Sequence, residues 1–238
     1  MPVAVVDEKS LPSDLQRDAL LEWVGRRARN GRTLRAFLSS IAFAALRPQE
    51  ALALRVRDTQ LPDGESGALV IRPRPLSGSD AVTGNVTGAP RVVPACPELV
   101  EILRAEVARR GLHPEDAMFT REDGLPLSDA IYRRVWRQAR EAVLETHEID
   151  SPLARSVGDL RDARISTWLK DHRTALDVLM VAERVGVSAS SLVRRFLYCF
   201  QQSREAANDL IEAAFAVSTE GESRHVALKS VARQRSAG

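Results

Sequence analysis

The pattern of apolar and polar residues at the start of the chain predicts two consecutive helices. Ser13, followed three residues later by Gln16, has the capping-box pattern of a helix N-terminus, and Asn30-Gly31 supplies a stop signal. A second helix is expected to begin at Thr33. Residues 34–46 are apolar on almost every side of this helix, which indicates that it is buried in the protein core.

The next segment changes from helical to strand-like character. Pro48 suits the first turn of a helix over residues 48–56. Ala68–Ile71 and Val92-Val93 are short runs of the β type, and the residues between them are rich in Gly, Ser, Thr and Asp. This pattern predicts a hairpin or small sheet with a long loop, to which Ala117–Phe119 is expected to add an edge strand.

The rest of the chain is expected to be helical. Pro97 opens an amphipathic helix that Gly111 closes, and Ser128 caps another helix. Further helices are predicted over residues 159–170, 174–185, 188–200 and 205–217. Residues 218–238 are polar and without periodicity, so we expect a disordered tail there. The predicted fold class is α+β, mostly α, with a small antiparallel sheet packed on a helical core.

The composition narrows the class of protein without naming a function. The chain has 238 residues and a formal net charge of +2. No apolar run approaches the roughly 20 residues of a membrane-spanning helix, and the N-terminus lacks a signal-peptide pattern, so we expect no membrane partner and a cytoplasmic location. Cys96 and Cys199 cannot make a disulfide framework, and neither they nor the histidines have metal-ligand spacing.

Arginine dominates the basic residues: Lys9, Lys170 and Lys229 are the only lysines among 34 cationic side chains. Arginine can bind a phosphate through two parallel hydrogen bonds. The arginines form two clusters in the sequence, one at Arg26, Arg27, Arg29, Arg32 and Arg35 and the other at Arg133, Arg134, Arg137 and Arg140. Each cluster is compatible with phosphate binding or with a solvated helix face.

Three motifs carry the strongest functional signal. ALRPQEALALRVRD places Arg47 after a buried helix, GDLRDARISTWL places Arg161 at the head of another, and RVGVSASSLVRRFLYC follows. These motifs resemble the arginine box, the HxLRHxxAT box and the LGHS-to-tyrosine box of the tyrosine recombinase (phage integrase) family. RVVPACPELVEILRAEVARRG, between the first two, resembles the strand and helix that follow the family's catalytic lysine. The order and the spacings agree with the family.

The resemblance extends from about Leu11 to Val217. It implies a recombinase catalytic-like domain over residues 1–217, without a separate N-terminal core-binding domain. In the family, a tyrosine hydroxyl attacks a DNA phosphodiester and forms a covalent link, while two arginines, a lysine and histidines stabilise the phosphoryl oxygens and protonate the leaving oxygen. No metal or nucleotide cofactor is required. Arg47 and Arg161 take the two arginine positions.

Several positions depart from the family's pattern. Gly158 and Val187 stand where the family has histidines, and Asp162 stands where a histidine often follows the second arginine. The segment between Ile71 and Arg91 contains no lysine. Because the loss of one charge-stabilising donor already slows such a reaction by ~10²-fold or more, these losses predict a greatly weakened active site.

The most serious departure concerns the nucleophile. Phe196 falls where the family's spacing places the tyrosine, and its ring has no hydroxyl that could attack a phosphodiester. Tyr198 is the alternative nucleophile, although a continuous helix would turn it about 200° away from Phe196. Tyr132, the other tyrosine, is expected to pack in the core.

The candidate DNA-binding residues are all arginines. Arg47 and Arg161 are expected to bind backbone phosphate, and Arg91, Arg194 and Arg195 are further candidates. Asp162 can neutralise Arg161 and so weaken its hold on phosphate. Glu50 matches the acidic residue after the family's first arginine and is expected to orient an arginine or cap a helix.

Three hypotheses about function follow. The first is a DNA-binding homologue of a tyrosine recombinase that does not cut DNA, as a regulator or accessory factor of a mobile element. The second is an active site-specific recombinase that uses Tyr198. The third is a protein-interaction module without a DNA role, which self-associates through the amphipathic helix over residues 205–217. Double-stranded DNA is the partner expected under the first two hypotheses.

Overall fold

The computed structural model describes residues 4–72, 90–171 and 174–200, so the predicted helix over residues 205–217 and the predicted tail over 218–238 lie outside the described residues. The chain divides into two compact units, Met1–Phe196 and Leu197–Gly238. In the second unit, the described residues form a short 3-10 helix, η4 (Leu197–Phe200). All other elements belong to the first unit.

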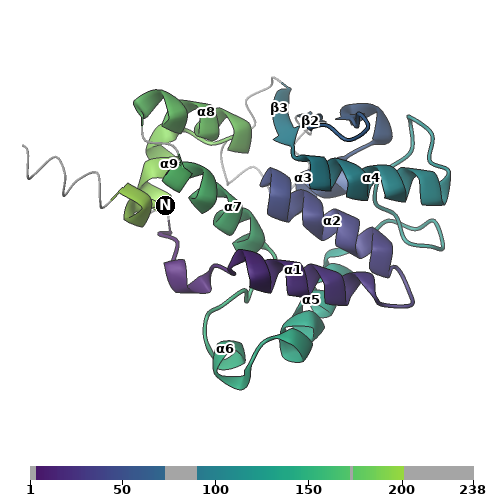
Figure 1. The fold of residues 1–238 in the computed structure, drawn as a ribbon, viewed down its shortest axis with the longest axis horizontal. Helices are drawn as coiled ribbons and strands as arrows, with labels where there is room; N and C mark the ends of the chain where they lie inside the picture. The colour runs from purple at the N-terminus through teal and green to yellow at the C-terminus, as the bar shows by residue number, and fades with distance from the viewer. Residues whose placement is uncertain (1–3, 73–89, 172–173, 201–238) are drawn as a thin grey trace, which may run out of the picture. The chain divides into compact units, whose positions relative to one another are not determined.

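The first unit is mostly helical, with one small sheet (Figure 1). Its helices are α1 (Asp14–Gly25), α2 (Gly31–Ala44), α3 (Pro48–Ala53), α4 (Pro97–Arg110), α5 (Asp129–Val143), α6 (Thr146–Asp150), α7 (Gly158–Asp171), α8 (Ala175–Val185) and α9 (Ala189–Arg195), with the 3-10 helices η1 (Glu8–Ser10) and η2 (Val56–Asp58). Its strands are β1 (Thr59–Gln60), β2 (Gly67–Ile71) and β3 (Arg91–Ala95).

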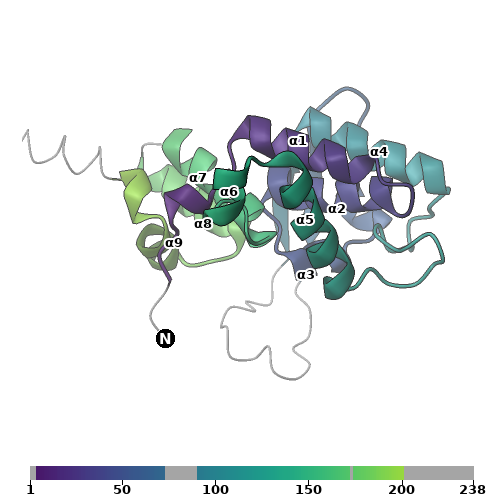
Figure 2. The same ribbon diagram turned by 90° about the horizontal axis from the view of Figure 1, so that it is seen from below.

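Helix α2 is the centre of the helical core, as its apolar sequence predicts. Only Arg32 and Arg35 of this helix are exposed, and α1, α4 and α7 pack around it (Figure 1). Phe37 of α2 lies edge-on to Phe119, with ring centroids 5.7 Å apart, and its ring also contacts Tyr132 of α5 at 5.0 Å. Tyr132 is therefore a packing residue, as predicted. Helix α5 runs beside α1 (Figure 2).

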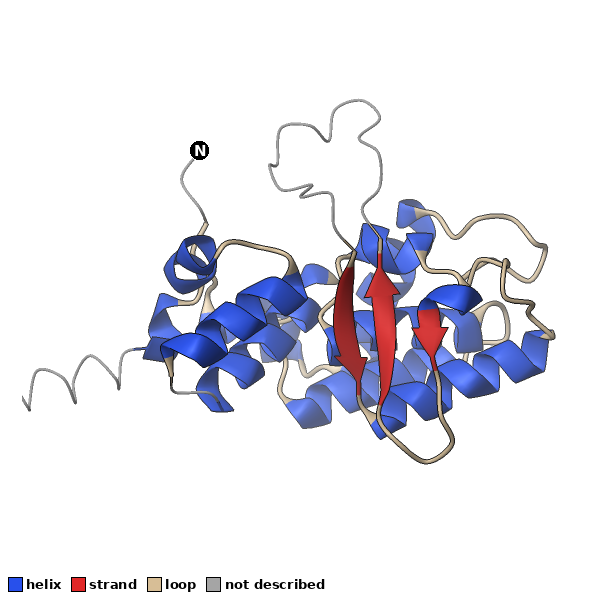
Figure 3. Cartoon of the chain, turned by 90° about the horizontal axis from the view of Figure 1, so that it is seen from above, coloured by secondary structure: helices blue, strands red, loops and turns tan. Residues whose placement is uncertain are grey.

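The sheet is antiparallel, with the strand order β1-β2-β3 (Figure 3). Leu69 of β2 is the register partner of Thr59 on one side and of Val93 on the other. Strand β3 packs against α2 and α8, which joins the sheet to the helical core. The predicted fold class, α+β with a small antiparallel sheet on a helical core, is confirmed.

The predicted edge strand over Ala117–Phe119 is wrong, and β1 takes the edge position instead. Ala117 makes only an isolated bridge to Arg55, whereas Met118 and Phe119 are almost fully buried. The apolar residues of this run fill the core and do not extend a ladder. Residues Thr59–Gln60 carry too short and too polar a pattern to have been recognised as a strand.

Two predicted helix ends are also wrong. Helix α1 ends at Gly25, before Asn30 is reached. Asn30 adopts the left-handed conformation (φ 56°) as the residue before α2, so it precedes the second helix and does not end the first. The predicted continuous helix over residues 188–200 breaks after Arg195, whose carbonyl accepts a hydrogen bond from the Val6 amide (2.9 Å). Phe196 has φ −113° and ψ 37°, which is not helical.

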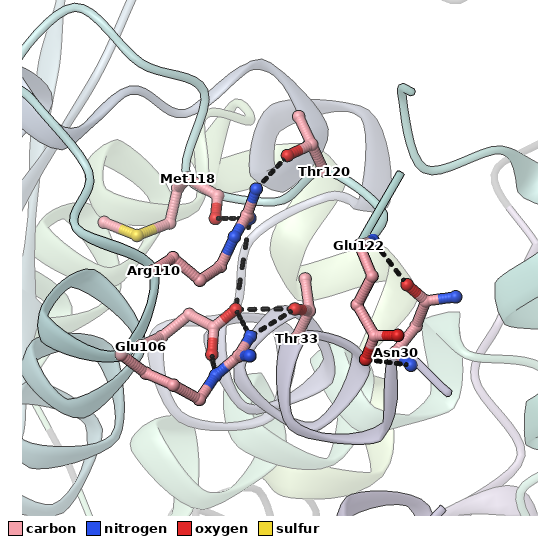
Figure 4. A network of polar contacts seen from close by, with 8 residues as sticks. Asn30, Thr33, Glu106, Arg110, Met118, Thr120 and Glu122 are labelled. Atoms are coloured by element: carbon pink, nitrogen blue, oxygen red, sulfur yellow. Dashed lines mark hydrogen bonds and ion pairs between the residues drawn. The ribbon is translucent and has the colours of Figure 1, made fainter. Parts of the chain in front are cut away.

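A buried polar network joins the start of α2 to the end of α4 (Figure 4). The Thr33 hydroxyl donates to Oε1 of Glu106 at 2.5 Å, and Arg109 donates to both oxygens of the same carboxylate. Arg110 donates to the Thr120 hydroxyl and to the Met118 carbonyl. Each partner satisfies a polar group that burial would otherwise leave without a hydrogen bond.

The described residues offer neither a membrane-spanning helix nor a metal cluster. None of the helices in residues 4–72, 90–171 and 174–200 is long and apolar enough to cross a membrane. Within the same ranges, no group of three His, Cys, Asp or Glu side chains is placed to hold a metal ion. Neither Cys96 nor Cys199 forms a disulfide within the described part of the chain.

Candidate phosphate-binding site

The site is built on the C-terminal end of helix α8. Gly186 follows the helix with φ 68°, a left-handed conformation that glycine adopts without steric cost. Its amide donates to the Glu183 carbonyl (3.1 Å), and the Val187 amide donates to the Ala182 carbonyl (3.1 Å). This is the Schellman arrangement, which uses the carbonyls of residues 182 and 183 and leaves those of residues 184, 185 and 186 to find other donors.

Three arginines from three separate elements donate to these consecutive carbonyls. Nε of Arg91 lies 2.9 Å from the carbonyl of residue 184, Nη2 of Arg161 lies 2.8 Å from that of residue 185, and Nη2 of Arg47 lies 3.1 Å from that of residue 186. The negative end of the helix dipole favours cations at this position. The structure therefore brings together three of the predicted DNA-binding arginines, from the start of β3, from α7 and from the residue before α3.

Arg161 is the buried member of the three, with 9% of the residue exposed. While Nη2 donates to the Val185 carbonyl, Nη1 donates to the Ala45 carbonyl at 2.7 Å. One guanidinium thus hydrogen-bonds to carbonyls at the C-terminal ends of both α2 and α8. The pKa of Arg161 is lowered to about 10, chiefly by burial; the charges of Glu50 and Asp162 raise it, and those of Arg47 and Arg91 add to the lowering. Arg161 is still charged at neutral pH.

Glu50 holds the other two arginines in place. Its Oε2 accepts the backbone amide of Arg47 (2.8 Å), which caps helix α3, and also accepts Nη2 of Arg91 (2.7 Å). Its Oε1 lies 4.0 Å from Nη1 of Arg47. Both functions expected of Glu50, orienting an arginine and capping a helix, agree with these contacts. Three guanidiniums and one carboxylate leave a local charge of about +2, which attracts anions.

The three arginines differ in their access to solvent. The Arg47 side chain is 41% exposed, whereas that of Arg91 is 17% exposed. A guanidinium has five N–H donors, and among the described residues Arg47 uses one of them, toward Gly186. Arg47 is therefore the side chain of this site that can reach an anion in solution without first breaking its existing hydrogen bond.

The position at which the family resemblance expects the nucleophile lies at the end of α9. Phe196 is fully buried, and the Arg195 side chain beside it donates to Oδ2 of Asp162 at 2.7 Å. Asp162 follows Arg161 on α7, so this ion pair ties the end of α9 to the helix that carries Arg161. The Asp162 carboxylate accepts this hydrogen bond from Arg195. Its charge also raises the pKa of Arg161, which agrees with the expectation that Asp162 neutralises part of the Arg161 charge.

The structure also describes the two positions at which the family resemblance expects histidines. Gly158 begins α7, and a Cβ atom built there would contact only the Ser156 hydroxyl, at 3.2 Å. Val187 follows the αL glycine, where an apolar residue is typical of the Schellman motif. Arg194 is exposed on α9 and has no hydrogen bond or ion pair with the residues that the structure describes.

Tyr198 lies in η4, within the second unit of the chain. The prediction that it turns about 200° away from Phe196 assumed one continuous helix, and that helix is interrupted after Arg195. The hypothesis that Tyr198 acts as the nucleophile stays a prediction.

The sequence did not predict that the carbonyls of residues 184–186 accept hydrogen bonds from the arginines. One signal was present: a glycine directly after an apolar helical segment, at Val185-Gly186, is typical of an αL helix end with unpaired carbonyls. The signal does not say which side chains come to that end, because the donors are distant in sequence. Arg91 was predicted as a DNA contact, but its ion pair with Glu50 was not.

Sequence comparison identifies no relative. No model of a known protein family matches the sequence. No curated protein matches it either.

Comparison of the fold with solved structures does find similar proteins. The XerH site-specific recombinase bound to difH substrate in a pre-cleavage complex has a TM-score of 0.62 and 18% identity, covering 87% of this chain and 55% of that one. The Tn1549 transposon integrase in complex with circular intermediate DNA has a TM-score of 0.61 and 11% identity, covering 87% and 68%. The XerA recombinase has a TM-score of 0.58 and 15% identity, covering 86% and 65%.

The chain thus spans little more than half the length of the XerH recombinase and about two thirds of the other two. At these identities the likeness concerns the backbone fold. It agrees with the fold that the arginine boxes of the sequence implied. The chain has the fold of the tyrosine recombinase catalytic domain.

Proposed function

We propose that this protein binds double-stranded DNA through the arginine site at the end of α8 and does not cleave it. The observation that carries the proposal is the convergence of Arg47, Arg91 and Arg161 on three consecutive carbonyls. Similar folds in XerH and in the Tn1549 integrase are seen with DNA, which supports the same class of ligand here.

The three arginines have different roles in this proposal. Arg47 contacts a backbone phosphate directly, because it is the most exposed of the three and has unused donors. Arg91 and Arg161 add positive charge from behind it, and they hold the end of α8 in position. Arg194, exposed on α9, and Arg195, paired with Asp162, are secondary phosphate contacts.

The absence of cleavage rests on the residues at the nucleophile and histidine positions. Phe196 offers a buried ring without a hydroxyl, and Gly158 and Val187 offer no proton donor in their side chains. The remaining arginines can bind a phosphodiester, but they cannot attack it. We therefore place the protein among regulators or accessory factors of mobile elements, with residues 1–217 acting as one catalytic-like domain.

Fluorescence anisotropy with a labelled duplex tests the binding. We expect affinity to fall steeply between about 50 and about 200 mM salt, because phosphate contacts release counterions. The variant Arg47→Ala is expected to weaken binding and to reduce the slope of log K against log salt by about one. The control is Arg137→Ala, which removes an equal charge from an exposed side chain on α5. A wild-type protein that does not bind at low salt contradicts the proposal and favours the protein-interaction hypothesis.

A nicked duplex that traps covalent intermediates tests the chemistry. We expect no protein–DNA adduct on a denaturing gel with the wild-type chain. An adduct that disappears in the variant Tyr198→Phe would overturn the proposed lack of cleavage and establish the alternative nucleophile.

A further inference from the structure

A basic cavity of about 260 Å³ lies at the other end of α2 from Arg47. It is enclosed by the turn between α1 and α2, by the segment around Arg121, and by the first half of α5. Helix α2 has 14 residues at a rise of 1.5 Å each, so its two ends are about 21 Å apart. The cavity therefore does not belong to the site at the end of α8.

Four arginines line this cavity, and no acidic residue does. Arg27 and Arg29 come from the turn after α1, Arg121 comes from the segment after α4, and Arg134 comes from α5. Two members of the first arginine cluster, Arg27 and Arg29, thus meet one member of the second, Arg134, about a hundred residues away in the sequence. The apolar floor of the cavity includes Leu34, which is buried.

Two of the four guanidiniums have partners that fix them at the cavity wall. The Arg27 guanidinium lies 5.2 Å from the centroid of the Trp23 ring, in the geometry of a cation–π contact. Arg121 forms an ion pair with Asp123. Neither partner lines the cavity, so the charges at its wall are all positive.

The other two guanidiniums have no ion pair with any residue in the described ranges. These are Arg29 and Arg134, both exposed. Their neighbours on α5 behave differently: Arg133 pairs with Asp129 at 3.2 Å and Arg137 pairs with Glu141 at 3.9 Å. The arginine that faces the cavity is thus unpaired, while the arginines beside it on the same helix are paired within their own helix.

The wall that carries Arg121 is held rigidly on both sides (Figure 4). Thr120 accepts a hydrogen bond from Arg110. Glu122 and Asn30 exchange two bonds: the Asn30 amide donates to Oε1 of Glu122 at 2.9 Å, and the Glu122 amide donates to Oδ1 of Asn30 at 2.8 Å. A binding site whose walls are fixed before the ligand arrives loses less entropy on binding.

We propose that this cavity, lined by Arg27, Arg29, Arg121 and Arg134, is a second phosphate-binding site. Guanidiniums pair with phosphate oxygens through parallel hydrogen bonds, and a multiply charged anion relieves the repulsion among four like charges. The phosphate can come from a nucleic-acid backbone or from a small phosphate anion. The backbone source rests on the proposed function: at about 3.4 Å per base pair, the two sites are separated by about six base pairs of one duplex.

The test compares two double variants that remove the same charge. Arg29→Ala/Arg134→Ala takes away the two unpaired guanidiniums of the cavity, and Arg133→Ala/Arg137→Ala takes away two paired ones on the same helix. All four side chains are exposed, so both proteins are expected to fold, which circular dichroism checks. Two readouts are used: duplex affinity as a function of salt, and the shift in melting temperature caused by inorganic pyrophosphate.

For the backbone source, we expect the cavity variant to bind the duplex roughly tenfold more weakly than the control variant, with a salt slope reduced by about two. For a small anion, pyrophosphate raises the melting temperature of the wild-type and control proteins but not of the cavity variant. If the wild type fails to bind DNA, the proposed function falls while the pyrophosphate readout still supports the cavity. The proposal is overturned if the two double variants behave alike in both readouts.

Discussion

Arg91 and Glu50 form the central ion pair of the site at the end of α8. Nη2 of Arg91 lies 2.7 Å from Oε2 of Glu50, and both side chains are less than one fifth exposed. The same carboxylate oxygen accepts the amide of Arg47. One acidic side chain thus fixes two of the three arginines that meet at α8.

Replacement of Glu50 is expected to destabilise the fold. Glu50→Ala leaves a largely buried arginine without its counter-charge and removes a helix cap, so we expect a loss of about 2–4 kcal/mol in the free energy of unfolding. Glu50→Gln keeps an acceptor for the amide of Arg47 and should cost about 1–2 kcal/mol. Urea denaturation measures both, with Glu141→Ala as the control, because its exposed pair should contribute less than about 1 kcal/mol. Equal effects of Glu50→Ala and Glu141→Ala would contradict the assigned role.

Gly186 is expected to tolerate no side chain. Gly186→Ala places a Cβ in a left-handed conformation and 3.1–3.2 Å from the Arg91 guanidinium. Gly111→Ala is the matched control, since Gly111 also follows a helix at positive φ but a Cβ at that position would have nothing within 4 Å. We expect the control to lose about 1 kcal/mol from backbone strain and Gly186→Ala to lose more, together with DNA affinity. If duplex binding is the same in both variants, the contact with Arg91 has no effect on the site.

Restoring the hydroxyl is not expected to restore cleavage. In Phe196→Tyr, the new oxygen enters a fully buried position, which should cost about 1–3 kcal/mol unless it finds a hydrogen-bond partner. The histidine positions still hold Gly158 and Val187. We expect no covalent adduct with a nicked duplex, and an adduct formed by this variant would show that the nucleophile alone is missing.

The charge on Asp159 should make stability depend on pH. Burial raises the pKa of Asp159 above its ordinary value of 3.8, against the lowering effect of the hydrogen bond from the Ser156 amide. A raised pKa means that the folded state favours the protonated form of Asp159. Protonated Asp159 therefore stabilises the folded state at low pH, and this contribution to the free energy of unfolding is lost as pH rises through the folded-state pKa.

Asp159→Asn keeps an acceptor oxygen and removes the charge. We therefore expect this variant to be more stable than the wild type at neutral pH. This difference should disappear at a pH below the ordinary pKa of an aspartate, where the wild-type Asp159 is also uncharged. Urea denaturation at the two pH values measures the difference. A difference in unfolding free energy that does not change with pH would contradict the assigned shift.

The sequence predicted the elements whose signals are local. The capping pair Ser13 and Gln16, the proline and glycine that bound α4, and the apolar length of α2 each fix an element within a few residues. The edge strand at Ala117–Phe119 was mispredicted, because an apolar run of three residues looks the same whether it pairs in a sheet or fills a core. Tertiary packing decides between the two.

The site was predictable in part for a related reason. The order of the boxes correctly suggested that Arg47 and Arg161 lie together, and they share the end of α8. The partner of Asp162 was not predictable, because its carboxylate reaches Arg195 across 33 residues of chain. Nor could Arg27, Arg29 and Arg134, which come from the two arginine clusters, be assigned to one cavity before the packing of α5 beside α1 was known.

The position of Arg161 between two helix ends has a consequence for reading related sequences. Its guanidinium completes the backbone hydrogen bonding of Ala45 and Val185, so the side chain would be retained for folding even in a lineage that no longer cuts DNA. An arginine at this place is therefore a poor marker of activity. The side chains at positions 158 and 187 make no such bonds to a helix end, so the residue types found there are a more direct sign of whether the chemistry is present.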